Sequence, residues 1–206
     1  MASVEEARQA VSQGASAVGL VARMPSGPGP IADELIASIA ATVPPGVATF
    51  LLTSETEPEA VVEHVLRCRV NTVQLVDRVP HEVYRALRTG APSVKIVQVV
   101  HVSAPESVEE AVACSAQVDA LLLDSGSFAG PVKELGGTGR VHDWSLSRRI
   151  VDSVPCPVYL AGGLRPANVA EAIAQVRPFG VDLCTGVRTN GKLDLEKLRE
   201  FMRAVG

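Results

Sequence analysis

The sequence predicts an α/β fold in which parallel strands alternate with helices, and two observations support this. Short apolar runs rich in β-branched residues recur along the 206 residues, and longer segments with helical spacing lie between them. Most of these runs are apolar almost throughout, which is typical of parallel strands buried on both faces. Strands are predicted at 16–23, 47–53, 72–77, 94–102, 120–125, 157–162 and 180–186, and helices at 3–13, 31–42, 57–66, 80–88, 106–115, 143–152, 166–173 and 192–204.

This order of elements favours a TIM-type (β/α)8 barrel from which the first strand is missing. Right-handed crossovers through eight helices place the seven strands in one parallel sheet. The chain opens on the helix at 3–13, where a regular barrel would begin with a strand. No linker rich in Gly, Ser or Pro divides the chain, so a single (β/α) barrel domain over 1–206 is expected.

Composition excludes several classes of protein. Hydrophobic residues make up 47% and aromatic residues 3%, which predicts an aliphatic core and excludes a disordered chain. The net charge is −4 and no basic run is long enough for a nucleic-acid track, so no nucleic acid is expected as a partner. No apolar run reaches ~18 residues and the N-terminus lacks a secretory signal, so we expect a cytoplasmic protein that does not enter a membrane. The four cysteines are widely spaced, which supports neither a metal site nor a disulfide framework.

Three loops that follow predicted strands carry glycines suited to binding phosphate. The active site of a parallel barrel lies at the carboxyl ends of its strands, and glycines let the backbone N–H groups approach an anion closely. Glycine turns also occur for purely structural reasons, but three in this order favour a phosphate site. The predicted phosphate-binding residues are Gly136, Gly137 and Thr138 in the first loop, Gly162 and Gly163 in the second, and Thr185 and Gly186 in the third.

Asp124 ends the apolar run Leu121–Leu123, where its carboxyl group would face the mouth of the barrel. Partial burial there would raise its pKa and suit it to act as a general acid or base. The alternative is a structural role as a helix cap or in a salt bridge.

In this order, these motifs resemble the phosphoribosylanthranilate isomerase family of tryptophan biosynthesis. The most specific pieces are Leu121–Asp124, Gly136–Arg140 followed by Asp143-Trp144, and Ala161–Leu164 with Pro166 and Asn168. The resemblance extends from the first helix to Val176–Asp182 and Thr185–Val187. It implies a TIM barrel that binds a small-molecule sugar-phosphate and uses no cofactor and no metal.

The resemblance also implies a reaction, the Amadori rearrangement of N-(5-phosphoribosyl)anthranilate. In this family a general acid protonates the ribose ring oxygen and a base removes the C2′ proton; Asp124 matches the general acid. The family's base is a cysteine at the end of the first strand, and Met1 aligns just after that motif. Cys184, His101 and His142 are the alternative bases in this sequence, although each suits a structural role as well.

Two further departures leave other functions open. The loop Pro25–Pro30 holds no arginine where the family binds the anthranilate carboxylate, and Val76 replaces a family histidine. The chain could therefore be an impaired isomerase, or a diverged paralogue that binds or isomerises another sugar-phosphate. A third alternative is a non-catalytic interaction protein that binds phosphate or accepts a strand. A barrel without its first strand would expose strand edges, which favours a homodimer through that edge.

Overall fold

The computed structural model describes residues 1–25, 29–125 and 142–206. These residues form two compact units, Met1–Gln98 and Val99–Gly206. Each unit is described by itself, and the single-domain expectation stays a prediction. No helix in the described ranges combines the length and the apolar character needed to cross a membrane.

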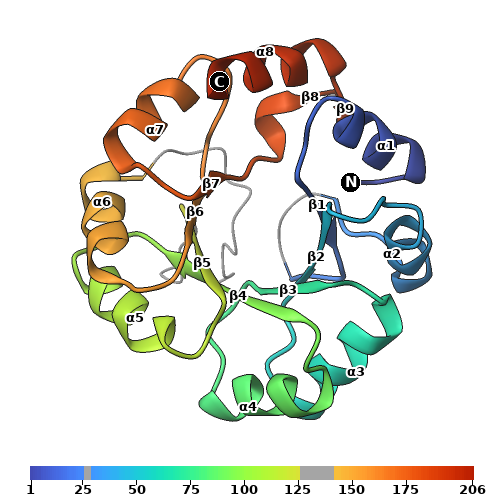
Figure 1. Ribbon diagram of the computed structural model, residues 1–206, viewed down its shortest axis with the longest axis vertical. Coiled ribbons are helices and arrows are strands. Elements are labelled where there is room, and N and C mark those ends of the chain that lie inside the picture. The colour runs from blue at the N-terminus through green and yellow to red at the C-terminus, as the bar shows by residue number, and fades with distance from the viewer. Residues whose placement is uncertain (26–28, 126–141) are drawn as a thin grey trace. The chain divides into compact units, whose positions relative to one another are not determined.

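The N-terminal unit repeats a strand–helix pattern (blue to green in Figure 1). Its strands pair in parallel in the order β1-β2-β3-β4, with Val18 level with Thr49 and Leu51 level with Val73. The strands are β1 (Ala17–Val21), β2 (Ala48–Thr53), β3 (Thr72–Leu75) and β4 (Lys95–His101), the last of which continues into the C-terminal unit. The helices are α1 (Val4–Ser12), α2 (Asp33–Ala40), α3 (Pro58–Cys68) and α4 (His81–Gly90).

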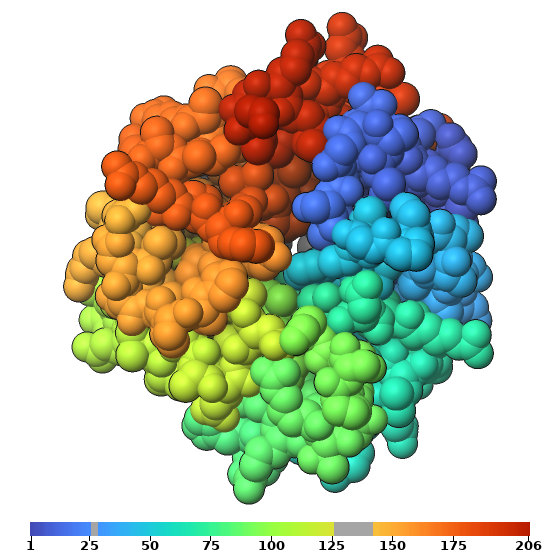
Figure 2. All heavy atoms as spheres, in the orientation of Figure 1, coloured from blue at the N-terminus to red at the C-terminus, as the bar shows by residue number. Residues whose placement is uncertain are grey.

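The C-terminal unit continues the same pattern with β5, β6 and β7 in parallel order. Its strands are β5 (Ala120–Asp124), β6 (Val158–Leu160) and β7 (Gly180–Val181), and its helices are α5 (Glu106–Ser115), α6 (Trp144–Ser153), α7 (Val169–Val176) and α8 (Leu195–Val205). A 3₁₀ turn, η1 (Thr185–Val187), and an antiparallel hairpin of β8 (Arg188–Thr189) and β9 (Lys192–Leu193) precede α8. Within each unit, helices that follow one another in the sequence lie side by side (Figure 2).

The core is aliphatic, as the composition predicts. All four residues of β3 and the first four of β5 are buried, which fits parallel strands covered on both faces. The helices add one buried stripe each, such as Val61, Val65 and Cys68 of α3.

The structure confirms the predicted alternation, with eight α-helices and seven parallel strands among the described residues. The main correction concerns the last strand, predicted over 180–186, which ends at Val181. The chain then turns into η1, where Gly186 packs against the backbone of Leu164. The last helix begins three residues later than predicted, because the Asp194 carboxylate caps the N–H groups of Glu196 and Lys197.

Candidate active site

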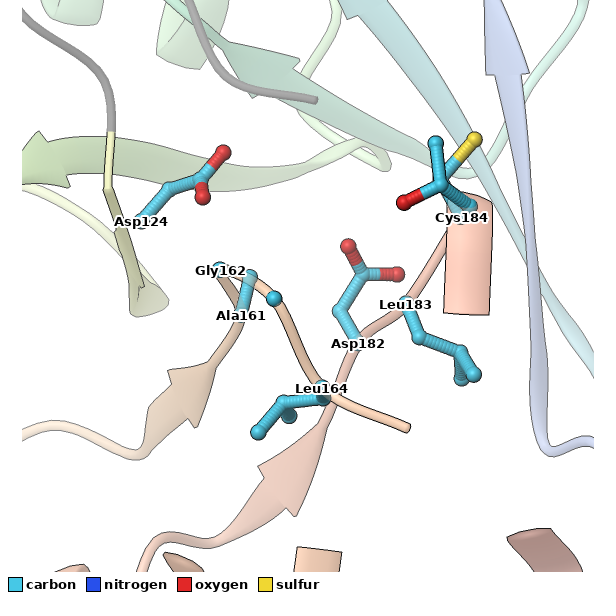
Figure 3. A pocket seen from close by; sticks show the side chains of 9 residues that line it. Asp124, Ala161, Gly162, Leu164, Asp182, Leu183 and Cys184 are labelled. Carbon is cyan, nitrogen blue, oxygen red and sulfur yellow. The ribbon is translucent and has the colours of Figure 1, made fainter. Parts of the chain in front are cut away.

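A pocket lies at the carboxyl ends of β5, β6 and β7, entirely within the C-terminal unit. It holds about 350 Å³ of space free of protein atoms, part of which is open to solvent. Figure 3 shows the carboxyl groups of Asp124 and Asp182 turned toward the same hollow, with the Ala161–Gly162 backbone between their strands. Nine described residues line it: Asp124, Ala161, Gly162, Gly163, Leu164, Asp182, Leu183, Cys184 and Thr185.

The structure places Asp124 as the sequence predicts, on the last residue of β5 and at the pocket. Its Oδ1 accepts the backbone N–H of Ser125 at 2.7 Å, which fixes the direction of the carboxyl group. Of the two structural alternatives for Asp124, a helix cap or a salt bridge, the cap at the start of α6 is provided by Asp143, which accepts the Ser145 N–H.

The turn between β6 and α7 presents two glycines at the pocket in backbone conformations that favour glycine. Gly162 has φ of +85° and Gly163 has φ of +65°. The side chain of Asn168 holds this turn from both sides, because its Oδ1 accepts the Arg165 N–H at 2.8 Å and its Nδ2 donates to the Gly163 carbonyl at 3.1 Å.

The third predicted loop packs directly against the second. A Cβ added to Gly186 would lie 2.1 Å from the Leu164 carbonyl oxygen, so only glycine allows this approach. Thr185, the residue before it, lines the pocket. The second and third glycine loops therefore meet at one place, as a shared phosphate site requires, whereas Gly136, Gly137 and Thr138 lie outside the described residues.

The three alternative bases occupy different places. Cys184 is exposed and lines the pocket, whereas His101 is buried at the end of β4 and is not among the lining residues. His142 lies just before α6; a Cβ on Gly162 would come within 3.1 Å of both the His142 Nδ1 and the Asp124 Oδ1. Cys184 therefore lines the same pocket as Asp124, and His142 lies beside Asp124, whereas His101 is not among the described lining residues.

A hydrogen bond to a buried serine fixes one side of the His142 ring. Its Nε2 lies 2.6 Å from Oγ of the fully buried Ser147, while its Nδ1 is buried with no hydrogen-bond partner among the described residues. Burial lowers the pKa of His142, although the nearby carboxylates of Asp124 and Asp143 act in the opposite direction. Burial therefore favours the neutral imidazole, and its Nδ1 lies on the Gly162 side, near the Asp124 carboxyl group.

Sequence analysis missed Asp182, the residue directly after β7. Burial raises the pKa of its carboxyl group to about 6, and the negative charge of Asp124 adds to the rise. The residue keeps an exposed surface at the pocket mouth, so surrounding protein atoms crowd the carboxyl group without sealing it from water. The signal that marks Asp124, an acidic residue where a strand ends, applies equally to Asp182; it was hidden because the strand was predicted to continue to Gly186.

One group in the N-terminal unit could hold a cation. The ligand atoms of Asp33, His64 and Cys68 lie within 4.8 Å of one another. These atoms have other roles, however: His64 Nε2 lies 3.2 Å from Asp33 Oδ1, and the Arg67 guanidinium donates to Asp33 Oδ2 at 2.8 Å. Burial raises the pKa of the Cys68 thiol to about 12, so a hydrogen-bonded structural cluster describes this group better than a metal centre.

Comparison with known proteins identifies the family. The family model of N-(5′-phosphoribosyl)anthranilate (PRA) isomerase matches residues 1–204. The chain belongs to this family. The N-(5′-phosphoribosyl)anthranilate isomerase of Methanocella arvoryzae is 37% identical over 202 residues, covering 98% of this chain and 92% of the relative. The corresponding Halobacterium salinarum protein is 39% identical over 201 residues, covering 94% of this chain and 87% of the relative.

Solved structures of the phosphoribosylanthranilate isomerase family support the TIM-type fold. The crystal structure of the Thermotoga maritima protein superposes with a TM-score of 0.83 at 30% identity, covering 100% of this chain and 95% of that one. A family member solved with reduced 1-(o-carboxyphenylamino)-1-deoxyribulose 5-phosphate gives a TM-score of 0.80 at 29% identity, covering 100% of this chain and 94% of that one.

Proposed function

We propose that this chain is a phosphoribosylanthranilate isomerase of tryptophan biosynthesis, which rearranges N-(5-phosphoribosyl)anthranilate with Asp124 as the general acid. The observation that carries this proposal is the pocket itself, where the Asp124 carboxyl group lies beside two glycine loops that meet at one point. The relative solved with a carboxyphenylamino-deoxyribulose phosphate supports a ligand that has both a phosphate and an open sugar chain.

The roles of the pocket residues follow from their chemistry. Backbone N–H groups of Gly162, Gly163, Thr185 and Gly186 bind the phosphate, because glycine turns let N–H groups converge on an anion. Anchoring the phosphate positions the ribose over the strand ends. Asp124 then protonates the ring oxygen as the bond between C1′ and that oxygen breaks.

The test is loss of the substrate's fluorescence in steady-state turnover, comparing the unaltered chain with Asp124→Asn. We expect kcat to fall by ~10²–10⁴-fold in Asp124→Asn, because the amide cannot donate the proton that opens the ring. Asp152→Asn is the matched control: Asp152 pairs with Arg148 on the exposed surface of α6, and its loss should leave kcat unchanged. Binding of ribose 5-phosphate without any turnover by the unaltered chain would instead favour a diverged or non-catalytic protein.

We also propose that two copies of the chain associate. The Thermotoga maritima phosphoribosylanthranilate isomerase is described as dimeric in a structure of monomers generated from it. Sedimentation should then give twice the 21.6 kDa mass of the chain, and a mass of one chain would contradict this proposal.

A further inference from the structure

A buried ring nitrogen of His142 lies close to the Asp124 carboxyl group. His142 Nδ1 and Asp124 Oδ1 would each lie 3.1 Å from a Cβ atom added to Gly162, so both atoms border the same small space beside that glycine. His142 Nδ1 is buried and makes no hydrogen bond within the ranges that the structure describes. Because buried polar groups nearly always have a partner, one is expected for this nitrogen.

The serine on the other side of the ring determines which nitrogen carries the hydrogen. Ser147 is fully buried on α6, and His142 Nε2, at 2.6 Å, is the one hydrogen-bond partner of its hydroxyl among the described residues. A buried hydroxyl must donate its hydrogen to an acceptor, and Nε2 accepts only when it carries no hydrogen of its own. Burial favours the neutral imidazole, which has a single N–H group. That group is therefore Nδ1–H, on the side of Asp124.

The charges around the ring favour the same arrangement. Asp124 and Asp143 are the two carboxylates that act on His142, with Asp124 the stronger. Asp143 Oδ1 already accepts the Ser145 N–H at 2.8 Å, where it caps α6. His142 Nδ1 lies near Asp124 Oδ1, so the negative charge of Asp124 stabilises a hydrogen on that nitrogen.

The two oxygens of Asp124 have different surroundings. Oδ1 accepts the Ser125 N–H at 2.7 Å and lies 3.4 Å from the Ser125 hydroxyl, and these are the hydrogen bonds that Asp124 makes with described residues. An oxygen that accepts an N–H group is a poor place for the acidic hydrogen, which therefore belongs on Oδ2. Figure 3 shows this carboxyl group turned toward the pocket, so Oδ2 is the oxygen left for a substrate.

We propose that His142 is a positioning residue for the general acid: its Nδ1–H group donates a hydrogen bond to Asp124 Oδ1 during turnover and leaves Oδ2 to deliver the proton. This rests on the proposed isomerase function and adds to it a residue that acts through Asp124. Catalytic hydrogen bonds are often long before the substrate binds and shorten in the transition state, which fits the open contact between Nδ1 and Oδ1.

The benefit arises as the sugar ring opens. Asp124 Oδ2 gives its proton to the ring oxygen, that oxygen keeps the electron pair of the broken C1′–O bond, and the nitrogen lone pair forms the C1′=N bond. The negative charge left on the carboxylate is shared by Oδ1, where the N–H groups of Ser125 and His142 stabilise it. Donors that are already in place when charge develops lower the barrier of the step.

Two amide substitutions at position 142 separate this role from a structural one. The amide nitrogen of asparagine is as many bonds from Cβ as Nδ1, whereas that of glutamine matches Nε2 and can keep the bond to Ser147. We expect kcat to fall by roughly 10–100-fold in His142→Gln, the usual effect of losing one hydrogen bond to a charged group. His142→Asn should keep a higher kcat than His142→Gln, although it loses the bond to Ser147. KM should change little in both variants, because the glycine loops are unaltered.

His81→Asn and His81→Gln are the matched controls, since His81 is exposed on α4, and both should leave kcat unchanged. A thermal melt shows that each variant is folded at the assay temperature. Long-range ¹H–¹⁵N NMR of the unaltered chain, labelled in its histidines, gives a readout that needs no substitution. The ring signals absent from His142→Gln belong to His142, and they should show a neutral imidazole with its hydrogen on Nδ1.

Three outcomes would overturn the role of His142. They are an unchanged kcat in His142→Gln, a kcat that is higher in folded His142→Gln than in folded His142→Asn, and a ring hydrogen on Nε2 in the NMR spectrum. If Asp124→Asn is inactive while both His142 variants are fully active, only this inference fails. Absence of turnover by the unaltered chain removes the proposed function, and this inference with it.

Discussion

Each unit contains a group of polar side chains; hydrogen bonds join the members of one group to each other, whereas the other group lines a pocket. In the N-terminal unit a continuous chain of hydrogen bonds links Thr53, His64, Asp33 and Arg67, with donor–acceptor distances of 2.8–3.2 Å. We call these four residues the Asp33 network.

The pocket of the C-terminal unit is different. His142 Nδ1 is buried with no hydrogen-bond partner among the described residues, and the Asp182 carboxyl group faces another carboxylate. Paired polar groups stabilise a fold, whereas open ones cost stability and remain available to a ligand. The comparison predicts that changes in the Asp33 network reduce stability and spare activity, and that changes in the pocket do the reverse.

The largest effect is expected for Gly186→Ala. The new Cβ would lie 2.1 Å from the Leu164 carbonyl oxygen, so the two glycine loops must move apart. A displacement of ~1 Å in a positioning element costs on the order of 10²-fold in rate, and we expect kcat/KM to fall by at least that much. Steady-state kinetics with a thermal melt measures both properties.

Gly19→Ala is the matched control for that change. Its added Cβ would lie 3.5 Å from the Leu52 side chain, an ordinary van der Waals contact. Equal kinetics for Gly186→Ala and the unaltered chain would show that the contact between the loops does not shape the site.

Asp33→Ala should have the next largest effect, on stability alone. It removes the acceptor of both His64 and Arg67, and the free energy of unfolding should fall by about 2 kcal/mol in urea. Burial acts to raise the pKa of Asp33, but its bonds and charges with Arg67 and His64 outweigh this and lower it. The stabilisation is therefore present above the ordinary pKa of 3.8 and is lost as the pH falls through the lower folded value.

Asp152→Ala serves as the control for Asp33→Ala, because Asp152 belongs to an exposed ion pair that should contribute less than ~1 kcal/mol. The isomerase rate should be unchanged in both variants. A loss of kcat in Asp33→Ala at temperatures where the variant is folded would contradict the prediction that the Asp33 network affects stability but not activity.

The sequence predicts the fold well because periodicity and glycine placement are local signals. The runs around 120–124 and 158–160 are strands because they are continuously apolar, and Asp124 is placed correctly because the apolar run ends at it. The length of β7 was not predictable in this way. Gly180-Val181 and Leu183 continue an apolar pattern, but the chain leaves the sheet after Val181 and turns into η1, where Gly186 packs against Leu164, which is distant in sequence.

The same limit explains why Asp182 and the hydrogen bond between His142 and Ser147 were missed. The pKa of Asp182 depends on Asp124, 58 positions earlier in the chain, and on atoms crowded around it by the fold. Ser147 lies five positions after His142, yet only the path of the chain into α6 shows that its hydroxyl meets the His142 Nε2. Properties set by tertiary contacts therefore need the structure, even when each residue is visible in the sequence.

A smaller effect, opposite in sign, is expected for the stability of Asp182→Asn. A raised pKa means that the folded chain favours the protonated carboxyl group, so its contribution is present below pH 3.8 and is lost as the pH rises through about 6. Asparagine cannot ionise and should keep that contribution. Because the residue is partly exposed, we expect a gain of about 1 kcal/mol or less at pH 7.5, measured as a higher urea midpoint. A variant that is less stable than the unaltered chain at pH 7.5 would mean that the carboxylate helps to hold the fold.

The smallest effect concerns His142. It tests whether a buried nitrogen without a partner among the described residues measurably changes the pH dependence of folding stability. The pKa of His142 is lowered chiefly by burial, so the folded chain favours the neutral ring. The contribution of this ring to stability is therefore present above the ordinary pKa of 6.5 and is lost as the pH falls through the lower folded pKa. The urea midpoint of the unaltered chain should therefore fall between pH 7.5 and 5.5 more steeply than that of His142→Gln, which has no proton to gain. His81→Gln, a change at an exposed histidine of α4, should keep the slope of the unaltered chain. If His142→Gln has that same slope, the imidazole must be able to take up a proton at no cost in the fold, and the Nδ1 beside Asp124 would then have to be open to water.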